Sequence, residues 1–550
     1  MTRPSFSAAN RSLFIDHLNT QQLDILVIGG GITGAGIALD ASSRGLKVAL
    51  IDKQDFAAGT SSRSTKLIHG GLRYLKQMEI GLVMEVGRER EIVYKNAPHL
   101  VIPEKMLLPV IEGGSLGKFS TSIGLYVYDM LAGVKAGERR KMLSKEATIK
   151  QEPLLRTDIL KAGALYIEYR TDDSRLVIET IKEAVNRGAT CINYMNCEGF
   201  EYDNGKIKSA KAKDIFTGKE INIKADYIIN ATGPWVDEIR EMDNSLKGKR
   251  LHLTKGVHLV FNYETLPLKQ SMYFDAPGGR MVFAIPRDGC TYLGTTDTNY
   301  TDQKNRPQVT QDDVDYLLKA ANGMFANRKL SQSDIVSSWA GLRPLIHEDG
   351  KSPSELSRKD EIFESPSGLL SIAGGKLTGY RKMSERITNL VMARIVEYKV
   401  LPFKACETKH IPLAGGFTSS AEVESFTQKL FNEAKQLNYT QAGIQKLVQR
   451  YGKKAQEVVN NAYTISQQIE KRETAPLLAE IDYGIQNEMV CMPADFFIRR
   501  TGMLYFDRSN INLQQEILSS ALQSSTGLSE EILKAGNVEL NEELNAVVGF

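Results

Sequence analysis

The sequence predicts an α/β protein with a Rossmann-like nucleotide-binding domain, a mixed β-sheet cap above it and an all-α C-terminal domain. Three observations predict this fold. A glycine-rich β-α-β pattern runs from Leu23 to Lys53, strand-like segments fill residues 251–300, and helical periods dominate from about residue 405. Parallel strands joined through a helix imply a layered α/β domain, and the change of period implies a separate helical unit.

The β-α-β pattern begins with "DILVIG", residues 24–29, a short apolar run ending in glycine that is typical of a buried strand. Small and apolar residues then recur at helical spacing from Ile32 to Arg44, and Gly45 follows as a helix stop. The second buried strand is "KVALID", residues 47–52. Two parallel strands of the nucleotide-binding sheet are therefore expected here.

The turn inside this unit carries the motif Gly29-x-Gly31-x-x-Gly34, and Asp52 closes the next strand. The first glycine permits a tight turn, the second lets the backbone approach a pyrophosphate, and the third lets the helix pack on the strand. The helix N-terminus offers free N–H groups to an anion, and the Asp52 carboxylate can accept hydrogen bonds from a ribose diol. The motif predicts a dinucleotide site without separating FAD from NAD.

The middle of the chain continues the alternation of elements. Residues 78–96 are periodic and charged, and they predict a helix that ends before a proline. Residues 174–194 predict a helix followed by a strand, and residues 199–233 predict strands joined by turns. Asn204-Gly205 is the strongest hairpin signal among these turns.

The strand-like segments of residues 251–300 include "LHLTKGVHLVFN" and "RMVFAIPRDGCTYLGTT", with a second hairpin signal at Asp288-Gly289. We interpret them as a mixed sheet that roofs a pocket over the nucleotide-binding domain. The helical texture after residue 405, as in "SAEVESFTQKLFNEAKQL", contains no catalytic pattern.

Composition narrows the functional classes. The 550 residues suffice for two or three domains with a large core, and five scattered cysteines are typical of reduced thiols in a cytosolic protein. We find no secretory signal, no apolar run long enough to span a membrane and no metal-ligand spacing.

The net charge of +3 is unevenly distributed. Residues 405–550 hold 13 basic and 18 acidic residues, so residues 1–404 carry a net positive charge. Dispersed basic residues argue against nucleic acid as a partner and favour anionic ligands or an anionic lipid surface.

The stretch "SSRSTKLIHGGLRYL", residues 61–75, is too polar for a core strand. Together with the glycine motif, "INATGPWVD", "TKGVHLV", "YLGTTDT", "GLRPL" and "AGGKLTGYR", it resembles the FAD-dependent glycerol-3-phosphate dehydrogenase family, in its respiratory, membrane-associated branch. The resemblance covers most of residues 20–385, and the tail from "KHIPLAGG" resembles the family's C-terminal helical domain.

This resemblance implies FAD as the cofactor and oxidation of sn-glycerol 3-phosphate to dihydroxyacetone phosphate, with hydride passing from C2 to flavin N5 and electrons leaving to a quinone. Residues 20–404 are expected to form the oxidoreductase unit and residues 405–550 the helical domain. Within the unit, residues 20–100, 150–245 and 335–404 are assigned to nucleotide binding, and residues 100–150 and 246–335 to the substrate-binding cap.

The resemblance also assigns residues to the cofactor. In the family, the segment that matches residues 60–67 wraps the flavin. Gly374 and Gly375 precede an apparent helix start, and we expect this second helix N-terminus to face the flavin and to suit its pyrimidine carbonyls in the reduced, anionic form. The expected cofactor-binding residues are Gly29, Gly31, Thr33, Gly34, Asp52, Lys53, Thr60, Ser61, Ser62, Lys66, Leu67, His69, Gly70, Ala231, Gly233, Gly375, Lys376, Leu377 and Thr378.

By the same resemblance, Arg73, Tyr74, His258, Arg343 and Lys376 are expected to bind the substrate, and the last three also to take part in catalysis. A small dianionic substrate requires several cations, and arginine meets phosphate oxygens with two parallel hydrogen bonds. His258 is our candidate for the base that accepts the C2 hydroxyl proton, because an ordinary histidine titrates near pH 6.5. The sequence leaves open that His258 serves only as a phosphate donor.

Three alternatives remain. An amine oxidase of the sarcosine or glycine oxidase type shares this architecture but would bind a carboxylate, and the substrate that bleaches the flavin would distinguish it. An oxidase that hands electrons to O₂ is a second rival, and a flavin-binding scaffold without turnover is a third.

We expect a cytoplasmic protein attached peripherally to the inner face of the cell membrane in a monotopic arrangement. "FSTSIGLYVYDMLAGV", residues 119–134, is either part of the docking surface or a core helix. The sequence does not decide whether the protein forms a homodimer.

Overall fold

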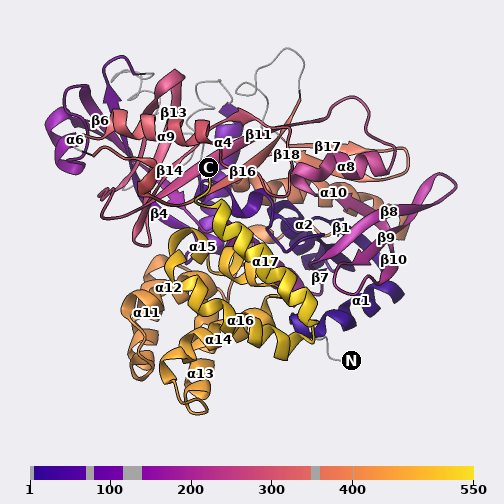
Figure 1. The fold of residues 1–550 in the computed structure, drawn as a ribbon. Helices are drawn as coiled ribbons and strands as arrows, with labels where there is room; N and C mark the ends of the chain where they lie inside the picture. The colour runs from indigo at the N-terminus through magenta and orange to yellow at the C-terminus, as the bar shows by residue number, and fades with distance from the viewer. Residues whose placement is uncertain (1–4, 70–79, 115–138, 327, 348–359, 400–401) are drawn as a thin grey trace.

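The computed structural model describes residues 5–69, 80–114, 139–326, 328–347, 360–399 and 402–550. Figure 1 shows two β-sheets side by side and a group of C-terminal helices below them, coloured orange to yellow. This arrangement confirms the predicted fold class: an α/β nucleotide-binding sheet, a mixed second sheet and a helical C-terminal region.

The first sheet has a parallel core. β1 (Gln22–Ile28) lies between β10 (Glu220–Asn230) and β2 (Val48–Ile51), and it pairs in parallel with both. β2 and β10 continue the parallel pairing outward. The remaining strands are β7 (Thr190–Ile192) beside β2, β18 (Leu370–Gly374) beside β10, and the antiparallel β17 (Asp360–Glu364), β8 (Met195–Asp203) and β9 (Lys206–Asp214).

The apolar runs of the sequence explain this core. β2 is buried along its whole length, and β1 is buried after its first residue, as expected for parallel strands that are covered on both faces. α2 (Ile32–Ser43) packs against α7 (Asp173–Asn186) and α10 (Tyr380–Lys399). The helix predicted from residue 32 to residue 44 is thus confirmed to within one residue.

The second sheet is mixed, as predicted. β12 and β4 pair in parallel, and the other strand pairs are antiparallel. Its strands are β3 (Leu67–Ile68), β4 (Ile102–Ile111), β5 (Lys141–Ser144), β6 (Leu160–Arg170), β11 (Leu251–Asn262), β12 (Ser271–Ala276), β13 (Arg280–Arg287), β14 (Cys290–Gly294), β15 (Thr298–Asn299) and β16 (Ile335–Ile346). The helices that accompany the two sheets are α1 (Arg11–Thr20), α4 (Ile80–Asn96), α6 (Lys145–Gln151), α8 (Val236–Met242) and α9 (Gln311–Met324).

Both predicted hairpins are present. Asn204 and Gly205 join β8 to β9 with φ angles of 50° and 76°, and Asp288 and Gly289 join β13 to β14 with φ angles of 55° and 84°. Two successive residues with positive φ define the turn whose twist matches that of antiparallel strands.

In the C-terminal region, residues 402–550 form helices joined by loops, with no strand among them. Its elements are α11 (Ser420–Ala434), α12 (Gln441–Tyr451), α13 (Ala455–Ser466), α14 (Ala475–Asn487), a π-helical turn (Asp495–Arg500), α15 (Met503–Phe506), α16 (Ile511–Thr526) and α17 (Glu530–Ala546). α11 to α13 bury residues in a core of their own, whereas Phe497, Leu518 and Leu540 belong to the core of the first sheet. The later helices are therefore packed directly onto the nucleotide-binding part.

The domain boundaries expected from the sequence stay a prediction. Three strands bear on them, because β3, β6 and β16 all pair within the mixed sheet, although the sequence assigns their residues to the nucleotide-binding domain.

Candidate functional site

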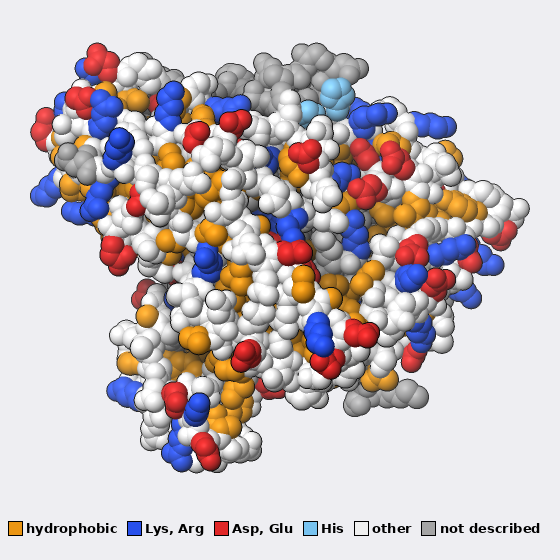
Figure 2. Space-filling view, viewed as in Figure 1, with side chains coloured by type: hydrophobic (Ala, Val, Ile, Leu, Met, Phe, Trp, Pro, Cys, Tyr) orange, Lys and Arg blue, Asp and Glu red, His pale blue; other side chains and the backbone are white. Residues whose placement is uncertain are grey.

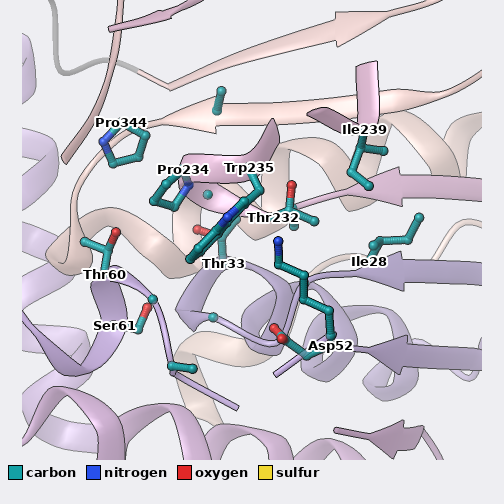
Figure 3. A pocket seen from close by; sticks show the side chains of 18 of the residues that line it. Ile28, Thr33, Asp52, Thr60, Ser61, Thr232, Pro234, Trp235, Ile239 and Pro344 are labelled. Atoms are coloured by element: carbon teal, nitrogen blue, oxygen red, sulfur yellow. The ribbon is translucent and has the colours of Figure 1, made fainter. Parts of the chain in front are cut away.

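A cavity of about 560 Å³ lies at the carboxyl ends of β1, β2, β10 and β18. Figure 3 shows Thr33, Asp52, Thr60, Ser61 and Trp235 around it. The lining residues fall within 28–33, 52–64, 196–198, 231–242 and 372–383, together with Ile215, Asn305 and Pro344. In open parallel sheets, ligands bind outside the carboxyl ends of the strands, so the position itself indicates a ligand site.

The glycine motif forms one wall of this cavity and behaves as its spacing predicts. Gly29 has a φ of 113°, and a Cβ there would lie 2.6 Å from the carbonyl oxygen of Ala231. A Cβ on Gly34 would lie 1.8 Å from the carbonyl oxygen of Gly29, so only glycine lets α2 start this close to β1. The first turn of α2 faces the cavity, where the Ile32 N–H donates to Ser61 Oγ over 3.1 Å. The open helix N-terminus and the narrow turn fit a pyrophosphate.

Asp52 and Lys53 extend this wall from the end of β2. Asp52 Oδ2 accepts a hydrogen bond from the Gly30 N–H at 2.6 Å, and Oδ1 accepts one from the Gln54 N–H at 2.8 Å. Burial raises the pKa of the Asp52 carboxyl to about 6. Lys53 Nζ lies 4.6 Å from the centre of the Trp235 ring, and burial lowers the pKa of this lysine.

The polar segment after residue 59 divides into two parts. Thr60 and Ser61 line the cavity, and the Thr60 hydroxyl donates to the carbonyl of Leu342 over 2.7 Å. Lys66 does not line it: Lys66 Nζ pairs with Asp173 Oδ1 at 2.6 Å and donates to the Ser62 carbonyl at 3.0 Å. Leu67 lies in β3. Lys66 therefore holds the segment to α7, and Leu67 joins it to the second sheet.

A second glycine turn follows β18. Gly374 and Gly375 have φ angles of 79° and 78°, and together with Lys376 and Leu377 they line the cavity. Thr378 is buried behind this turn and donates to the carbonyl of His69 over 3.3 Å. The turn after β18 is thus linked to the end of the polar segment.

His258 and Arg343 lie on β11 and β16, two neighbouring antiparallel strands of the second sheet. The His258 ring is buried, stacks on Trp339 with centroids 4.7 Å apart, and has Nε2 at 3.0 Å from Thr65 Oγ1. Burial, and then the positive charges of Arg343 and Lys66, hold the pKa of His258 well below its ordinary value. His258 is therefore neutral at pH 7.

Arg343 is positioned by three contacts. Its Nη2 donates to Thr295 Oγ1 at 2.8 Å, and its Nη1 lies 3.3 Å from the carbonyl oxygen of Thr296 and 3.4 Å from Asp297 Oδ1. A Cβ on Gly256 would lie 2.1 Å from Nη2, so glycine at this cross-strand position leaves room for the guanidinium. Pro344, the next residue, lines the cavity.

The cavity brings together most of the residues predicted for the cofactor: Gly29, Gly31, Thr33, Asp52, Lys53, Thr60, Ser61, Ala231, Gly233, Gly375, Lys376 and Leu377. Gly34, Ser62, Lys66, Leu67, His69 and Thr378 are not among its lining residues, and neither are His258 and Arg343. Gly70, Arg73 and Tyr74 lie outside the described residues, as does the apolar segment 119–134. The assigned roles stay predictions.

Sequence reasoning missed several lining residues. Trp235 belongs to the quoted motif "INATGPWVD", so the motif itself could have indicated it. Residues 196–198 of β8 and Asn305 reach the cavity only through the pairing of distant segments, and no local pattern marks them.

Comparison with known families gives two matches. Residues 24–381 match the family described as FAD dependent oxidoreductase, and residues 406–531 match the C-terminal domain of alpha-glycerophosphate oxidase. The boundary between the matches agrees with the change from mixed structure to helices near residue 405.

Individual proteins are similar over the whole chain. The aerobic glycerol-3-phosphate dehydrogenase of Bacillus subtilis is 50% identical over 550 residues, which cover 100% of this chain and 99% of that protein. The protein of the same name from Staphylococcus aureus strain USA300 is 50% identical over 92% of this chain and 91% of its own length.

The solved structures include that of glycerol-3-phosphate dehydrogenase from Bacillus halodurans complexed with FAD, which has a TM-score of 0.84 and 43% identity and covers 99% of this chain and 98% of that one. Reduced L-alpha-glycerophosphate oxidase from Mycoplasma pneumoniae, at 18% identity, shares the fold with a TM-score of 0.55 over 68% of this chain and 95% of its own.

Proposed function

This chain belongs to the family of FAD-dependent aerobic glycerol-3-phosphate dehydrogenases, and we therefore propose that it oxidises sn-glycerol 3-phosphate to dihydroxyacetone phosphate. The observation that carries the proposal is the 50% identity to such a dehydrogenase along the entire chain. The cavity supports it, because its glycine turns, helix N-terminus and Asp52 fit a dinucleotide such as FAD.

The cations support the choice of a phosphorylated substrate. Lys376 lines the cavity, and Arg343 immediately precedes the lining residue Pro344. We propose that these two residues, with Arg73 and Tyr74, bind the substrate phosphate and orient the C2 carbon. Arginine is suited to this role because its planar fork meets two phosphate oxygens at once.

Bound FAD supplies the hydride acceptor for this reaction. The chain must remove the proton of the C2 hydroxyl, and we propose His258 as the acceptor of that proton. Its lowered pKa keeps one ring nitrogen unprotonated at pH 7, and the contact with Thr65 together with the Trp339 stack holds the ring in one orientation.

We further propose that the electrons leave to a quinone at a membrane surface. None of the described helices is long and apolar enough to cross a bilayer, so attachment would be peripheral. On the face shown in Figure 2, cationic and anionic side chains are interspersed. Flotation with anionic liposomes tests the attachment. If the protein stays at the bottom of the gradient, the proposed membrane attachment is wrong.

The test of the main proposal is to add sn-glycerol 3-phosphate to the anaerobic protein and record the flavin absorbance near 450 nm. Prompt bleaching supports the substrate. If sarcosine or glycine bleaches the flavin and glycerol 3-phosphate does not, the amine-oxidase alternative is correct. Readmitting air and measuring hydrogen peroxide then distinguishes O₂ from quinone as the acceptor.

A further inference from the structure

The C-terminal helical region makes a buried ionic contact with the loop that carries the nucleotide-binding residues of β2. Asp55 follows Asp52, Lys53 and Gln54, which line the cavity, but its own carboxylate is bound by the C-terminal region. Arg499 Nε donates to Asp55 Oδ2 at 2.6 Å. Arg500 donates to both oxygens, from Nη1 at 2.8 Å and from Nη2 at 3.0 Å.

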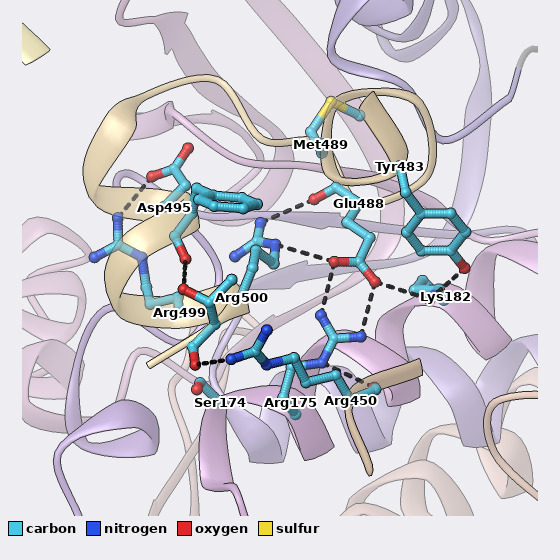
Figure 4. A network of polar contacts seen from close by, with 12 residues as sticks. Ser174, Arg175, Lys182, Arg450, Tyr483, Glu488, Met489, Asp495, Arg499 and Arg500 are labelled. Atoms are coloured by element: carbon cyan, nitrogen blue, oxygen red, sulfur yellow. Dashed lines mark hydrogen bonds and ion pairs between the residues drawn. The ribbon is translucent and has the colours of Figure 1, made fainter. Parts of the chain in front are cut away.

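This contact is part of a larger buried cluster, part of which Figure 4 shows. Asp495 accepts from Arg499 at 2.6 Å, and Arg500 Nη2 also donates to the carbonyl of Glu488 at 2.8 Å. The Glu488 carboxylate accepts from Arg175 of α7 at 2.7 and 2.8 Å. The cluster pairs four cations with four carboxylates: Arg175, Lys182, Arg499 and Arg500 with Asp55, Glu179, Glu488 and Asp495.

The electrostatics of Asp55 depend on its partners. The side chain is fully buried, which alone would raise its pKa, yet the charges of Arg500 and Arg499 hold the pKa below its ordinary value. A buried carboxylate of this kind is stable only with its partners in place, so the loop conformation and the docking of the helical region depend on each other.

Apart from the arginines, the loop is held by the buried ring of Phe56 and by the Ala57 N–H, which donates to the carbonyl of Gly30 at 3.0 Å. Lys53, Gln54 and Ala58 line the nucleotide cavity and also a second cavity of about 670 Å³. Ala57 has a φ of 63°, a conformation that is unfavourable for a residue with a side chain and that needs its surroundings to hold it.

The carboxylates that these arginines bind also contact the segment that leads to a second part of the cavity wall. Asn193 donates from Nδ2 to Asp55 Oδ1 at 2.8 Å, and the Tyr194 hydroxyl donates to Asp495 at 2.6 Å. The Tyr194 and Met195 N–H groups bind the carbonyls of Gln54 and Asp52 at 3.0 and 2.7 Å. Residues 196–198, which follow, line the cavity. The cluster thus holds two adjacent wall segments together.

We propose that Asp55, Arg499 and Arg500 are positioning residues through which the C-terminal helical region holds the FAD-binding loop 52–60 in its binding conformation. Affinity for FAD then depends on a domain that contributes no residue from 402–550 to the lining of the FAD cavity. By thermodynamic reciprocity, FAD must in turn stabilise the docking of that domain.

Two variants test the proposal in the full chain. Asp55→Asn removes the charge, and Arg500→Lys keeps the charge but loses the two-pronged contact. Each is expected to raise the dissociation constant for FAD by about tenfold or more, an ordinary coupling between two sites. The readouts are FAD fluorescence titration of the apoprotein and the melting temperature of the same apoprotein.

The matched control is Glu480→Gln, which removes a carboxylate that accepts from Arg450 at 2.6 Å and from the Tyr451 hydroxyl at 2.9 Å inside the helical region. It should lower the apoprotein melting temperature and leave FAD affinity within about twofold of wild type, since it does not touch the loop. FAD affinity that falls in all three variants in step with melting temperature would overturn the proposal.

A measurement on the unmodified protein keeps the test decisive if the variants fail to fold. Addition of FAD to the apoprotein should slow hydrogen exchange of the backbone amides of residues 488–501, although these residues lie outside the FAD cavity. Unchanged exchange in this segment would contradict the proposal.

Discussion

At the scale of single residues, the second sheet carries two chemically different histidines. His258 is buried against Trp339 and contacts Thr65, whereas His252, on the same strand β11, is only partly buried and contacts Asn299 Oδ1 at 2.9 Å. Burial and neighbouring cations make the first a neutral group beside charged residues, which is the state that a proton acceptor requires. The sequence alone could single out His258 through its motif but not through this environment.

Replacement of His258 by Asn should slow anaerobic flavin reduction by glycerol 3-phosphate by about 10² to 10⁴, the usual contribution of a positioned base. Stopped-flow absorbance near 450 nm measures the rate. His252→Asn is the control on the same strand and should leave the rate unchanged. A His258→Asn rate within about twofold of wild type would refute the base role.

His99 gives a pH prediction. It is buried, and neither ring nitrogen has a hydrogen-bond partner among the described residues. Burial, and then the charges of Arg175 and Lys182, lower its pKa to about 3. The unfolded chain takes up this proton near pH 6.5 and the folded chain does not, so stability falls as the pH drops below about 6.5.

We therefore expect His99→Leu to lose roughly 2 kcal/mol less stability than wild type between pH 7 and pH 5. Urea unfolding at the two pH values measures the difference. His410, an exposed histidine, supplies the control His410→Leu, whose loss should equal that of wild type. An equal loss in His99→Leu and wild type would show that His99 titrates normally.

At the scale of elements, the sequence predicted those structures that depend on residues close together in the chain. The β1–α2–β2 unit, both hairpin turns and the helical C-terminal region follow from residues close together in the sequence. Pairings between distant segments could not be read in this way. β3 joins β6, and β4 joins β12, through contacts whose energy depends on tertiary packing. For the same reason the ion pair of Lys66 with Asp173, on a helix distant in the sequence, could not be predicted from local pattern, and the role of Lys66 at the flavin stays a prediction.

Gly34 tests the contact between α2 and β1. Gly34→Ala places a methyl group 1.8 Å from the Gly29 carbonyl oxygen, so the helix start must move and FAD affinity should fall by about a hundredfold or more. The control is Gly81→Ala in α4, where a Cβ meets no atom within 4 Å and a small gain in helix stability is expected. FAD titration of both apoproteins decides, and equal affinities would contradict the assigned role of Gly34.

At the scale of the whole molecule, the cavity gathers residues from eight separate parts of the chain and both sheets contribute, since Pro344 belongs to β16. A ligand that contacts so many segments stabilises the folded state as a whole by mass action. Because the lining residues come from distant parts of the chain, the sequence could predict this site only through its local motifs.

Removal of FAD should therefore lower the stability of the entire protein. Free FAD at about 100 times its dissociation constant is expected to add about 2.7 kcal/mol to the unfolding free energy of the apoprotein. FMN, which lacks the adenosine half that Gly29 to Asp52 would hold, should add much less at the same concentration. Thermal unfolding with each nucleotide measures this, and equal stabilisation by both would count against the dinucleotide site.

The distance in sequence between Asp55 and Arg500 also sets an order of events during synthesis. A ribosome adding about 5–20 residues per second needs roughly 25 to 100 s to reach residue 500, long after the loop at residue 55 has emerged. Until then the Asp55 carboxylate lacks the guanidinium groups that hold it in the finished protein. By this proposal, tight binding of FAD becomes possible only after residue 500 has been added, and a product truncated before that residue should bind FAD more weakly than the full chain.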